Sequence, residues 1–411
     1  MKINKHCFPN GLRLVHYEDT STQMVALNIV YDVGARDEHP EHTGFAHLFE
    51  HLMFGGSAHI PDYDTPLQLA GGENNAWTNN DITNYYLTVP KPNVETAFWL
   101  ESDSMLELAF SEQSLEVQRG VVMEEFKQRC LNQPYGDVGH LFRPLAFRVH
   151  PYRWPTIGKE LSHIEQATLD EVKSFFYRFY APNNAVLAVT GNISWDETVK
   201  FTEKWFAPIP RRDVPVRQLP QEPEQTQERR LTVERNVPLD ALFMGYHMCS
   251  REGADYYAFD ILSDILSNGR SSRLNRRLVQ EQNIFSGIDA YISGTRDAGL
   301  LQISGKPAAG VSLEQAEAAV RKELEELQRS PVDGQELEKV KNKFESTQIF
   351  GNINYLNVAT NLAWFELTGK AEDIDLEVER YRSVTTEQLH TVAQRTFCES
   401  NAVVLYYKSD K

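Results

Sequence analysis

The sequence is poor in cysteine and has no long apolar run. Its four cysteines stand far apart along 411 residues, at Cys7, Cys130, Cys249 and Cys398. Such wide spacing excludes zinc-ribbon and thioredoxin-like motifs and argues against a framework of disulfides. No stretch of about eighteen apolar residues occurs, and the first residues lack the apolar segment of a signal peptide. We therefore expect a cytoplasmic protein that has no membrane partner.

Positive charge is scarce as well. Lys and Arg total 41 against 58 Asp and Glu, which gives a formal net charge of −17. Because an acidic surface repels phosphate backbones, we expect no nucleic-acid partner. Hydrophobic residues make up 41% and charged residues 24%, a balance that excludes disordered and fibrous chains. The length is sufficient for two or three ordinary domains.

A proline-rich segment divides the chain into two halves. Residues 207–230 carry five prolines among Arg, Gln and Glu and contain little that can be buried. This composition is typical of an extended, solvated linker. We therefore predict an N-terminal domain over 1–206, a linker over 207–230 and a C-terminal domain over 231–411.

The two halves resemble each other in the order of their patterns. In both, an amphipathic helix pattern leads through a polar turn into a buried strand pattern, at 169–189 and again at 386–405. A strand pattern at 27–31 has a counterpart at 242–246, at a nearly equal offset. Collinear matches of this kind indicate an internal duplication. Strands mixed with long helices predict an α+β fold, in which each half is a mainly antiparallel sheet packed with helices.

The pentapeptide His47-Leu48-Phe49-Glu50-His51 is the strongest chemical signal. On a helix, positions i, i+3 and i+4 share a face, so both imidazoles and the carboxylate point the same way. Two neutral imidazoles at this spacing can bind one zinc ion, and the glutamate beside them can accept a proton from water. The alternative is an ordinary histidine pair without a metal, so a third ligand must be found elsewhere in the chain.

A helix pattern over 112–129 offers two candidates for that ligand, Glu124 and Glu125. Along this helix a stripe with the spacing i, i+3, i+4 and i+7 is formed by Gln118, Val121, Val122 and Glu125. This stripe places Glu125 beside apolar neighbours and Glu124 on a different face. A partly buried carboxylate needs a counter-charge, which zinc would supply. Without the H-x-x-E-H motif, either glutamate alone is better explained as a solvated helix residue.

The segment from His47 to Gly56 resembles the zinc site of the pitrilysin-type inverzincin peptidases, a family that includes insulysin and the mitochondrial processing peptidase. Three further stretches match that family in order, at 72–85 (G-x-x-N-A-x-T-x-x-D-x-T-x-Y), 119–125 and 150–158. The matches span nearly the whole first half. The short, duplicated chain resembles two-domain bacterial members and the beta subunit of the processing peptidase.

The resemblance implies a role for each residue of the motif. By it, His47, His51 and Glu125 ligate one zinc ion per chain, and Glu50 is the general base. The implied reaction is hydrolysis of short or unfolded peptides. A non-catalytic scaffold or processing subunit is the alternative, and the complete ligand set favours the peptidase.

The resemblance also implies substrate contacts, with two departures from the family pattern. Asn75 and Ala76 match an edge strand that binds extended peptide through main-chain hydrogen bonds, whereas their composition alone favours a polar turn. Gln118 stands where the family often has a glutamate that supports the distal ligand. Arg277 matches an arginine of a substrate clamp, although a solvated helix residue is an equal explanation. The tyrosine of that clamp is replaced by Ser286.

The second half is expected to bind no metal. Asp260, Ser263 and Asp264 stand where the duplication would place the zinc-binding histidines and the glutamate. A chain with one metal-binding half matches family members that work as pairs. The resemblance therefore implies a dimer, either of this chain with itself or with a homologue that lacks H-x-x-E-H.

Overall fold

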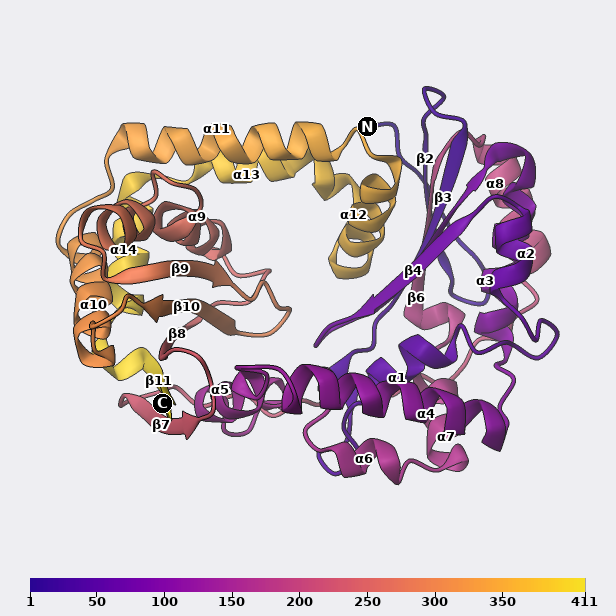
Figure 1. Ribbon diagram of the computed structural model, residues 1–411. Helices are drawn as coiled ribbons and strands as arrows, with labels where there is room; N and C mark the ends of the chain where they lie inside the picture. The colour runs from indigo at the N-terminus through magenta and orange to yellow at the C-terminus, as the bar shows by residue number, and fades with distance from the viewer. Residues whose placement is uncertain (411) are drawn as a thin grey trace. The chain divides into compact units, whose positions relative to one another are not determined.

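The computed structural model describes residues 1–410, which form two compact units (Figure 1). The N-terminal unit comprises Met1–Leu131, Trp154–Pro220 and Ile349–Leu376. The C-terminal unit comprises Asn132–Arg153, Gln221–Gln348 and Glu377–Lys411, of which the last residue is not described. Each unit contains one sheet and a set of helices, so the predicted α+β fold with two homologous halves is confirmed.

The sheet of the N-terminal unit has six strands. Only β2 and β6 pair in parallel, and the other neighbours are antiparallel. In spatial order the strands are β1 (Asn4–Cys7), β2 (Arg13–Glu18), β6 (Ala185–Gly191), β3 (Met24–Tyr31), β5 (Thr83–Pro90) and β4 (Glu73–Thr78). Strand β4 is therefore an edge of this sheet.

The sheet of the C-terminal unit repeats this order without a counterpart of β1. Its parallel pair is β7 with β11, which corresponds to β2 with β6. In spatial order the strands are β7 (Arg229–Arg235), β11 (Ala402–Ser409), β8 (Ala241–Met248), β10 (Gly299–Pro307) and β9 (Phe285–Ile292). The same order with the same single parallel pair confirms the duplication that the sequence indicated.

Helices follow β3 and β5 in the N-terminal unit and the corresponding strands β8 and β10 in the C-terminal unit. Those of the N-terminal unit are α1 (Phe45–Leu52), α2 (Asp64–Leu69), α3 (Val94–Leu106), α4 (Glu112–Phe126), α6 (Leu161–Glu165), α7 (Leu169–Phe179), α8 (Trp195–Trp205) and α12 (Tyr355–Thr368). Those of the C-terminal unit are α5 (Val138–Ala146), α9 (Tyr256–Ser267), α10 (Leu313–Arg329), α13 (Glu377–Ser383) and α14 (Thr386–Thr396). The boundary at 348/349 falls within α11 (Gly334–Gly351).

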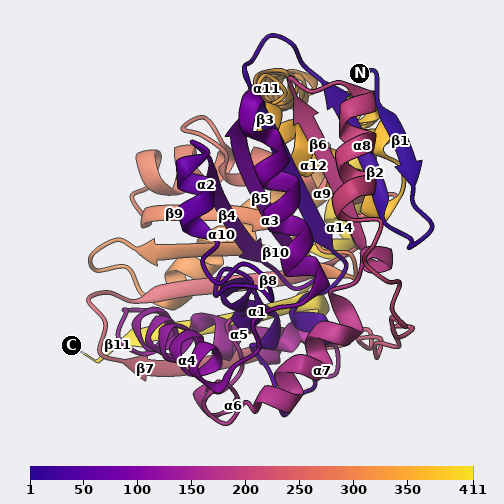
Figure 2. The ribbon, with the colours of Figure 1, turned by 90° about the vertical axis from the view of Figure 1, so that its right-hand side faces the viewer.

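Each sheet is covered on one face by a helix that comes from the other half of the sequence. In the N-terminal unit, alternate residues of β3 face the main core, whereas Ala26 and Val30 face Leu362 and Ala363 of α12. Figure 2 shows α3 and α8 over one face of this sheet and α12 behind it. Successive side chains of a strand point to opposite faces of the sheet, and both faces are apolar here. A helix is therefore needed on each face.

The C-terminal unit has the reciprocal arrangement. Helix α5 from the first half packs Phe142 and Ala146 against β8 and β11. Gly245 of β8 permits this approach, because a Cβ there would lie 2.8 Å from the Phe142 ring. The compact units therefore do not follow the predicted boundaries at 206 and 230, since one face of each sheet is covered by a helix from the other half of the sequence.

The proline-rich segment contains no helix or strand before β7, in keeping with an extended linker. It is nevertheless held by buried polar contacts rather than solvated throughout. Arg212 and Arg217 bind the N-terminal unit, and the Arg217 Nε lies 2.6 Å from Asp37 Oδ1. Glu222 and Gln225 bind the C-terminal unit, where Gln225 Nε2 donates to the Ala402 carbonyl at 2.8 Å. The chain passes from one unit to the other between Pro220 and Gln221.

Among residues 1–410, no helix combines the length and the apolar character that crossing a bilayer requires.

The exchanged helix α12 gives a stability prediction. Leu362 is fully buried against the sheet, whereas Leu376, at the end of the same exchanged segment, is 42% exposed. We expect Leu362→Ala to lower the free energy of unfolding by about 2–5 kcal/mol, because it leaves a cavity, and Leu376→Ala by about 0.5 kcal/mol or less. Urea unfolding of both variants measures the difference. Equal effects would show that α12 does not support this sheet.

Candidate metal centre

Helix α1 carries the H-x-x-E-H motif, and burial fixes its orientation. Six of its eight residues are buried, namely Phe45, Ala46, His47, Leu48, Phe49 and Leu52. The ring of Phe49 stacks on those of Phe175 and Tyr180, with centroids 5.2 Å and 5.0 Å away. The helix therefore cannot rotate without uncovering these apolar groups, so His47 is held buried and His51 partly buried on one side.

Helix α4 brings Glu125 to the histidines. It begins at Ser111, whose hydroxyl accepts the Ser114 N–H, and it is fixed by buried Leu115, Val122 and Phe126. Val121 is 45% exposed, so it does not belong to the buried face of α4 that the spacing predicted. Glu125 lies on the same side of the helix as buried Val122. A π-helix, Lys127–Leu131, follows directly after α4.

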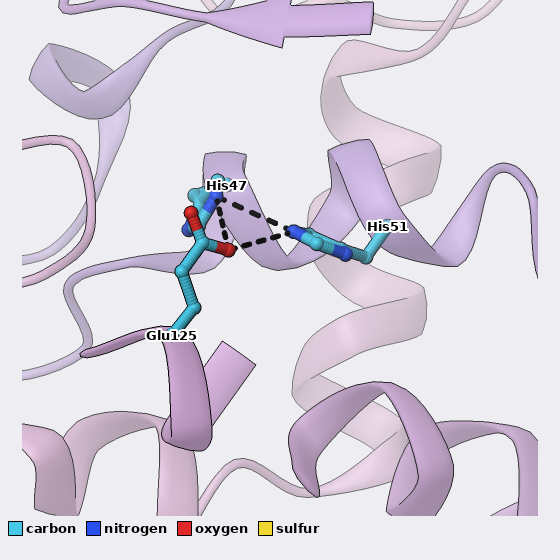
Figure 3. Close-up of side chains that lie close together, drawn as sticks. All are labelled: His47, His51 and Glu125. Carbon is cyan, nitrogen blue, oxygen red and sulfur yellow. Dashed lines mark hydrogen bonds and ion pairs between the residues drawn. The ribbon is translucent and has the colours of Figure 1, made fainter. Parts of the chain in front are cut away.

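The three side chains meet in a nearly equilateral triangle (Figure 3). Nε2 of His47 lies 3.4 Å from Nε2 of His51, and Oε2 of Glu125 lies 3.4 Å and 3.3 Å from these two atoms. Ligand atoms on tetrahedral bonds of about 2.0–2.1 Å stand roughly 3.3–3.4 Å apart. The triangle therefore fits three ligands of a tetrahedral zinc ion and leaves the fourth position open. Within residues 1–410 no other cluster of potential ligands has comparable geometry.

The electrostatics of the triangle suit a metal. Burial lowers the pKa of His47 to about 4, although Glu125 opposes this shift, so the imidazole is neutral at pH 7 and has a free lone pair. A hydrogen bond from His51 lowers the pKa of Glu125 despite partial burial, which keeps the carboxylate ionised. Neutral imidazole and ionised carboxylate are the protonation states that bind zinc.

Glu50 lies on α1 between the two histidines and is only partly buried. Burial raises its pKa, and the Thr78 hydroxyl and His51 partly offset that rise. A carboxylate whose pKa is raised is a stronger base than an ordinary glutamate, which suits a group that accepts a proton from water.

Arg129 is a functional residue that the sequence interpretation missed. Its Nη1 lies 3.0 Å from Oε1 of Glu125, so this oxygen is held while Oε2 faces the histidines. The signal was present in the sequence, because a cation four residues after a carboxylate lies on the same helix face. His47 has no comparable support on the far side of its ring, since among residues 1–410 its Nδ1 has no hydrogen-bond partner.

Gln118 does not take the supporting role that the resemblance implied. It lies on α4 two turns before Glu125, and in the described part of the chain it makes no hydrogen bond with His47, His51 or Glu125. Its amide nitrogen lies instead near Gly55.

Strand β4 lies beside α1 at the edge of its sheet. Asn75 and Ala76 are in this strand, so they do not form the polar turn that their composition favoured. The Ala76 N–H donates to Asn75 Oδ1 at 2.8 Å. The turn comes later, where Asn79 Oδ1 accepts the N–H groups of Asp81 and Ile82.

The expected clamp residues of the C-terminal unit are occupied by other contacts. Arg277 forms ion pairs with buried Glu323 and with Glu326 on α10, so its guanidinium is a structural group. The Ser286 hydroxyl donates to the Lys306 carbonyl. Asp260, at the position of a zinc ligand in the repeat, accepts the Tyr381 hydroxyl instead.

Two protein-family models match this chain. The model described as Insulinase (Peptidase family M16) covers residues 13–137, which include the whole triangle. The model described as Peptidase M16 inactive domain covers residues 166–344. The metal triangle therefore lies in the half that matches the first model.

Individual proteins resemble the chain over nearly its full length. The zinc protease PqqE of Helicobacter pylori is 26% identical over 97% of this chain and 91% of that protein. The uncharacterized zinc protease YmxG of Bacillus subtilis is 25% identical over 98% of both.

Solved structures agree in fold. A crystal structure of a protease from Helicobacter pylori has a TM-score of 0.94 and 26% identity over 99% of both chains. A peptidase M16 inactive domain from Pseudomonas fluorescens, 16% identical, covers 100% of this chain and 99% of its own with a TM-score of 0.90, which shows the fold alone. Because both matched models describe one family and together span more than half of the sequence, the protein belongs to peptidase family M16, the pitrilysin-type family, in its two-domain bacterial size.

Proposed function

We propose that this protein is a zinc-dependent endopeptidase that hydrolyses short or unfolded peptides and holds one zinc ion per chain. The observation that carries the proposal is the triangle of His47, His51 and Glu125, whose 3.3–3.4 Å edges match tetrahedral zinc. The relatives named zinc protease support it.

Each residue of the site has a separate role in the proposed reaction. A zinc ion held by His47, His51 and Glu125 would polarise the scissile carbonyl and lower the pKa of water towards ~7. Glu50, beside the triangle, accepts the proton of the attacking water and returns it to the leaving amine. Arg129 fixes the orientation of the Glu125 carboxylate through Oε1.

Strand β4 is the proposed site of substrate binding. It lies beside α1 and has a strand neighbour on one side only, so an extended peptide can add to its free edge. The peptide would replace the Asn75 side chain as the partner of the Ala76 N–H. This mode requires an extended chain, which favours unfolded peptides over folded proteins.

A scaffold or processing subunit without activity is the second candidate, because one matched model is described as an inactive domain. That model covers residues 166–344, whereas all three ligands and Glu50 lie within 13–137. The complete set therefore favours the peptidase.

The first prediction separates metal binding from catalysis. His51→Ala and Glu125→Gln should lose most bound zinc, because each removes a ligand. Glu50→Gln should keep zinc and lower hydrolysis by about 10²-fold or more, because it removes only the base. Metal analysis and a quenched peptide substrate measure both properties.

Glu124→Gln is the matched control, because Glu124 is exposed and pairs with Lys127. It should leave zinc content and rate unchanged. If it strips the metal while Glu125→Gln does not, the assignment of the third ligand is wrong.

The second prediction concerns Arg129. Arg129→Gln should weaken zinc affinity about tenfold, because partners that orient a ligand typically contribute 10–100-fold. Lys127→Gln, which removes a cation of the same π-helix that pairs with Glu124, serves as control. Competition with a zinc chelator measures both affinities, and equal values would exclude a role for Arg129.

We also propose that the protein acts as a dimer, because within residues 1–410 a candidate metal site is found in one of the two homologous units only. Its partner is a second copy or a homologue without H-x-x-E-H. Mass in solution and the peptidase rate of the isolated chain test this. A fully active monomer would contradict it, and a fully active homodimer would exclude the heterologous partner.

A further inference from the structure

Helix α1 begins without a capping side chain of its own. Its N-cap residue is Gly44, with φ of 91°, a conformation in which a Cβ would also lie 2.7 Å from Ile164. The first N–H groups of a helix need acceptors from outside it, and a glycine has no side chain to supply one. The start of the helix that holds the metal-binding histidines must therefore be fixed by another residue.

Glu38 supplies the missing acceptors from six residues upstream. Its Oε2 accepts the Gly44 N–H and its Oε1 accepts the Ala46 N–H, both at 2.9 Å. The carboxylate is only 6% exposed. Both oxygens are used, although burial raises the pKa of the Glu38 carboxyl group to about 8. One side chain therefore fixes the position and the direction of the first turn.

The hydrogen bonds from Gly44 and Ala46 to Glu38 lie close in sequence to the proposed metal ligand and general base. Ala46 precedes His47, and Glu50 follows one turn later on a helix of eight residues. A metal site tolerates ligand displacements of only about 0.2 Å. A shift of the first turn therefore carries over to the triangle that His47 forms with Glu125 on the separate helix α4.

The residues that precede Glu38 in the chain are held by three contacts. Arg36, two residues before it, pairs with Asp81 at 3.1 Å, and both side chains are almost fully buried. The Trp154 indole N–H donates to the Ala35 carbonyl at 2.9 Å. In the third contact, Arg217 of the linker binds Asp37.

The Arg217 contact is bidentate and shielded. Its Nε lies 2.6 Å from Oδ1 of Asp37 and its Nη2 lies 3.2 Å from Oδ2, and the Asp37 side chain is 3% exposed. Arg217 also donates to the Asp32 carbonyl at 2.8 Å. The proline-rich segment is therefore fastened to the residue that adjoins Glu38.

We propose that Glu38 is a positioning residue of the metal site, which fixes the start of α1 and thereby places His47 and Glu50 relative to Glu125, with the Arg217–Asp37 pair holding Glu38 in place. This inference rests on the proposed zinc peptidase function. It gives a role to a buried side chain that is not one of the three proposed zinc ligands.

The test compares Glu38→Gln with Glu41→Gln in the full-length protein. Glutamine keeps the size of the side chain but offers one oxygen acceptor in place of two and has no charge. Glu41 is an exposed residue of the same loop, so its variant controls for a glutamate-to-glutamine exchange in that loop. In the zinc-free protein, hydrogen exchange at the Gly44 and Ala46 amides should quicken about tenfold in Glu38→Gln alone.

The zinc-loaded protein gives the second readout. In Glu38→Gln, zinc affinity should fall about tenfold, kcat should fall by about the same factor, and KM should stay within about twofold. The visible spectrum of the cobalt-substituted variant should change, because the ligand geometry is altered. A purely structural role would lower the melting temperature and leave the spectrum and kcat of the folded protein unchanged.

Arg217→Gln is the second variant and keeps the proposal testable if Glu38→Gln does not fold. It should quicken exchange at Gly44 and Ala46 and weaken zinc affinity, each by a smaller factor than Glu38→Gln does. Unchanged exchange at Gly44 and Ala46 together with unchanged zinc affinity in the folded variants would overturn the proposal. If the native protein binds no zinc at all, the proposed function fails, while the exchange measurement still decides whether Glu38 fixes α1.

Discussion

The burial of helix α1 is the constraint on which the rest of the site depends. Six of its eight positions are buried, and Phe49 stacks on the rings of Phe175 of α7 and of Tyr180. This packing decides the rotation of the helix and so places two imidazoles and a carboxylate at one surface. The ligand geometry is thus a consequence of hydrophobic packing, since interiors are as dense as crystals and resist small shifts.

Local features of the site were predictable from the sequence. The H-x-x-E-H spacing places His47, Glu50 and His51 on one side of any helix, whatever its surroundings, because it depends only on helix geometry. The choice of Glu125 over Glu124 needed the family resemblance, since both fit a helix equally well. The structure explains that choice by the packing of Val122, which lies inward, while Val121 points outward.

The features that were not predictable depend on contacts between distant segments. Arg277 matched a clamp by sequence, but the buried carboxylate of Glu323 on another helix occupies it. Gln118 matched a supporting position, yet Arg129 is the residue that holds Glu125. That the two sheets share one strand order followed from the duplication, whereas the exchange of α5 and α12 did not, because no local pattern shows which sheet an apolar helix face will cover.

The exchange of covering helices has a consequence for synthesis of the chain on the ribosome. The N-terminal unit contains both the first residue and Ile349–Leu376, so its sheet stays bare on one face until most of the polypeptide has emerged. During this interval Val15, Ala26 and Val30 are open to water and to other nascent chains. The strands of the N-terminal sheet are thus complete at residue 191, whereas the helix that covers its second face is not made until residues 355–368.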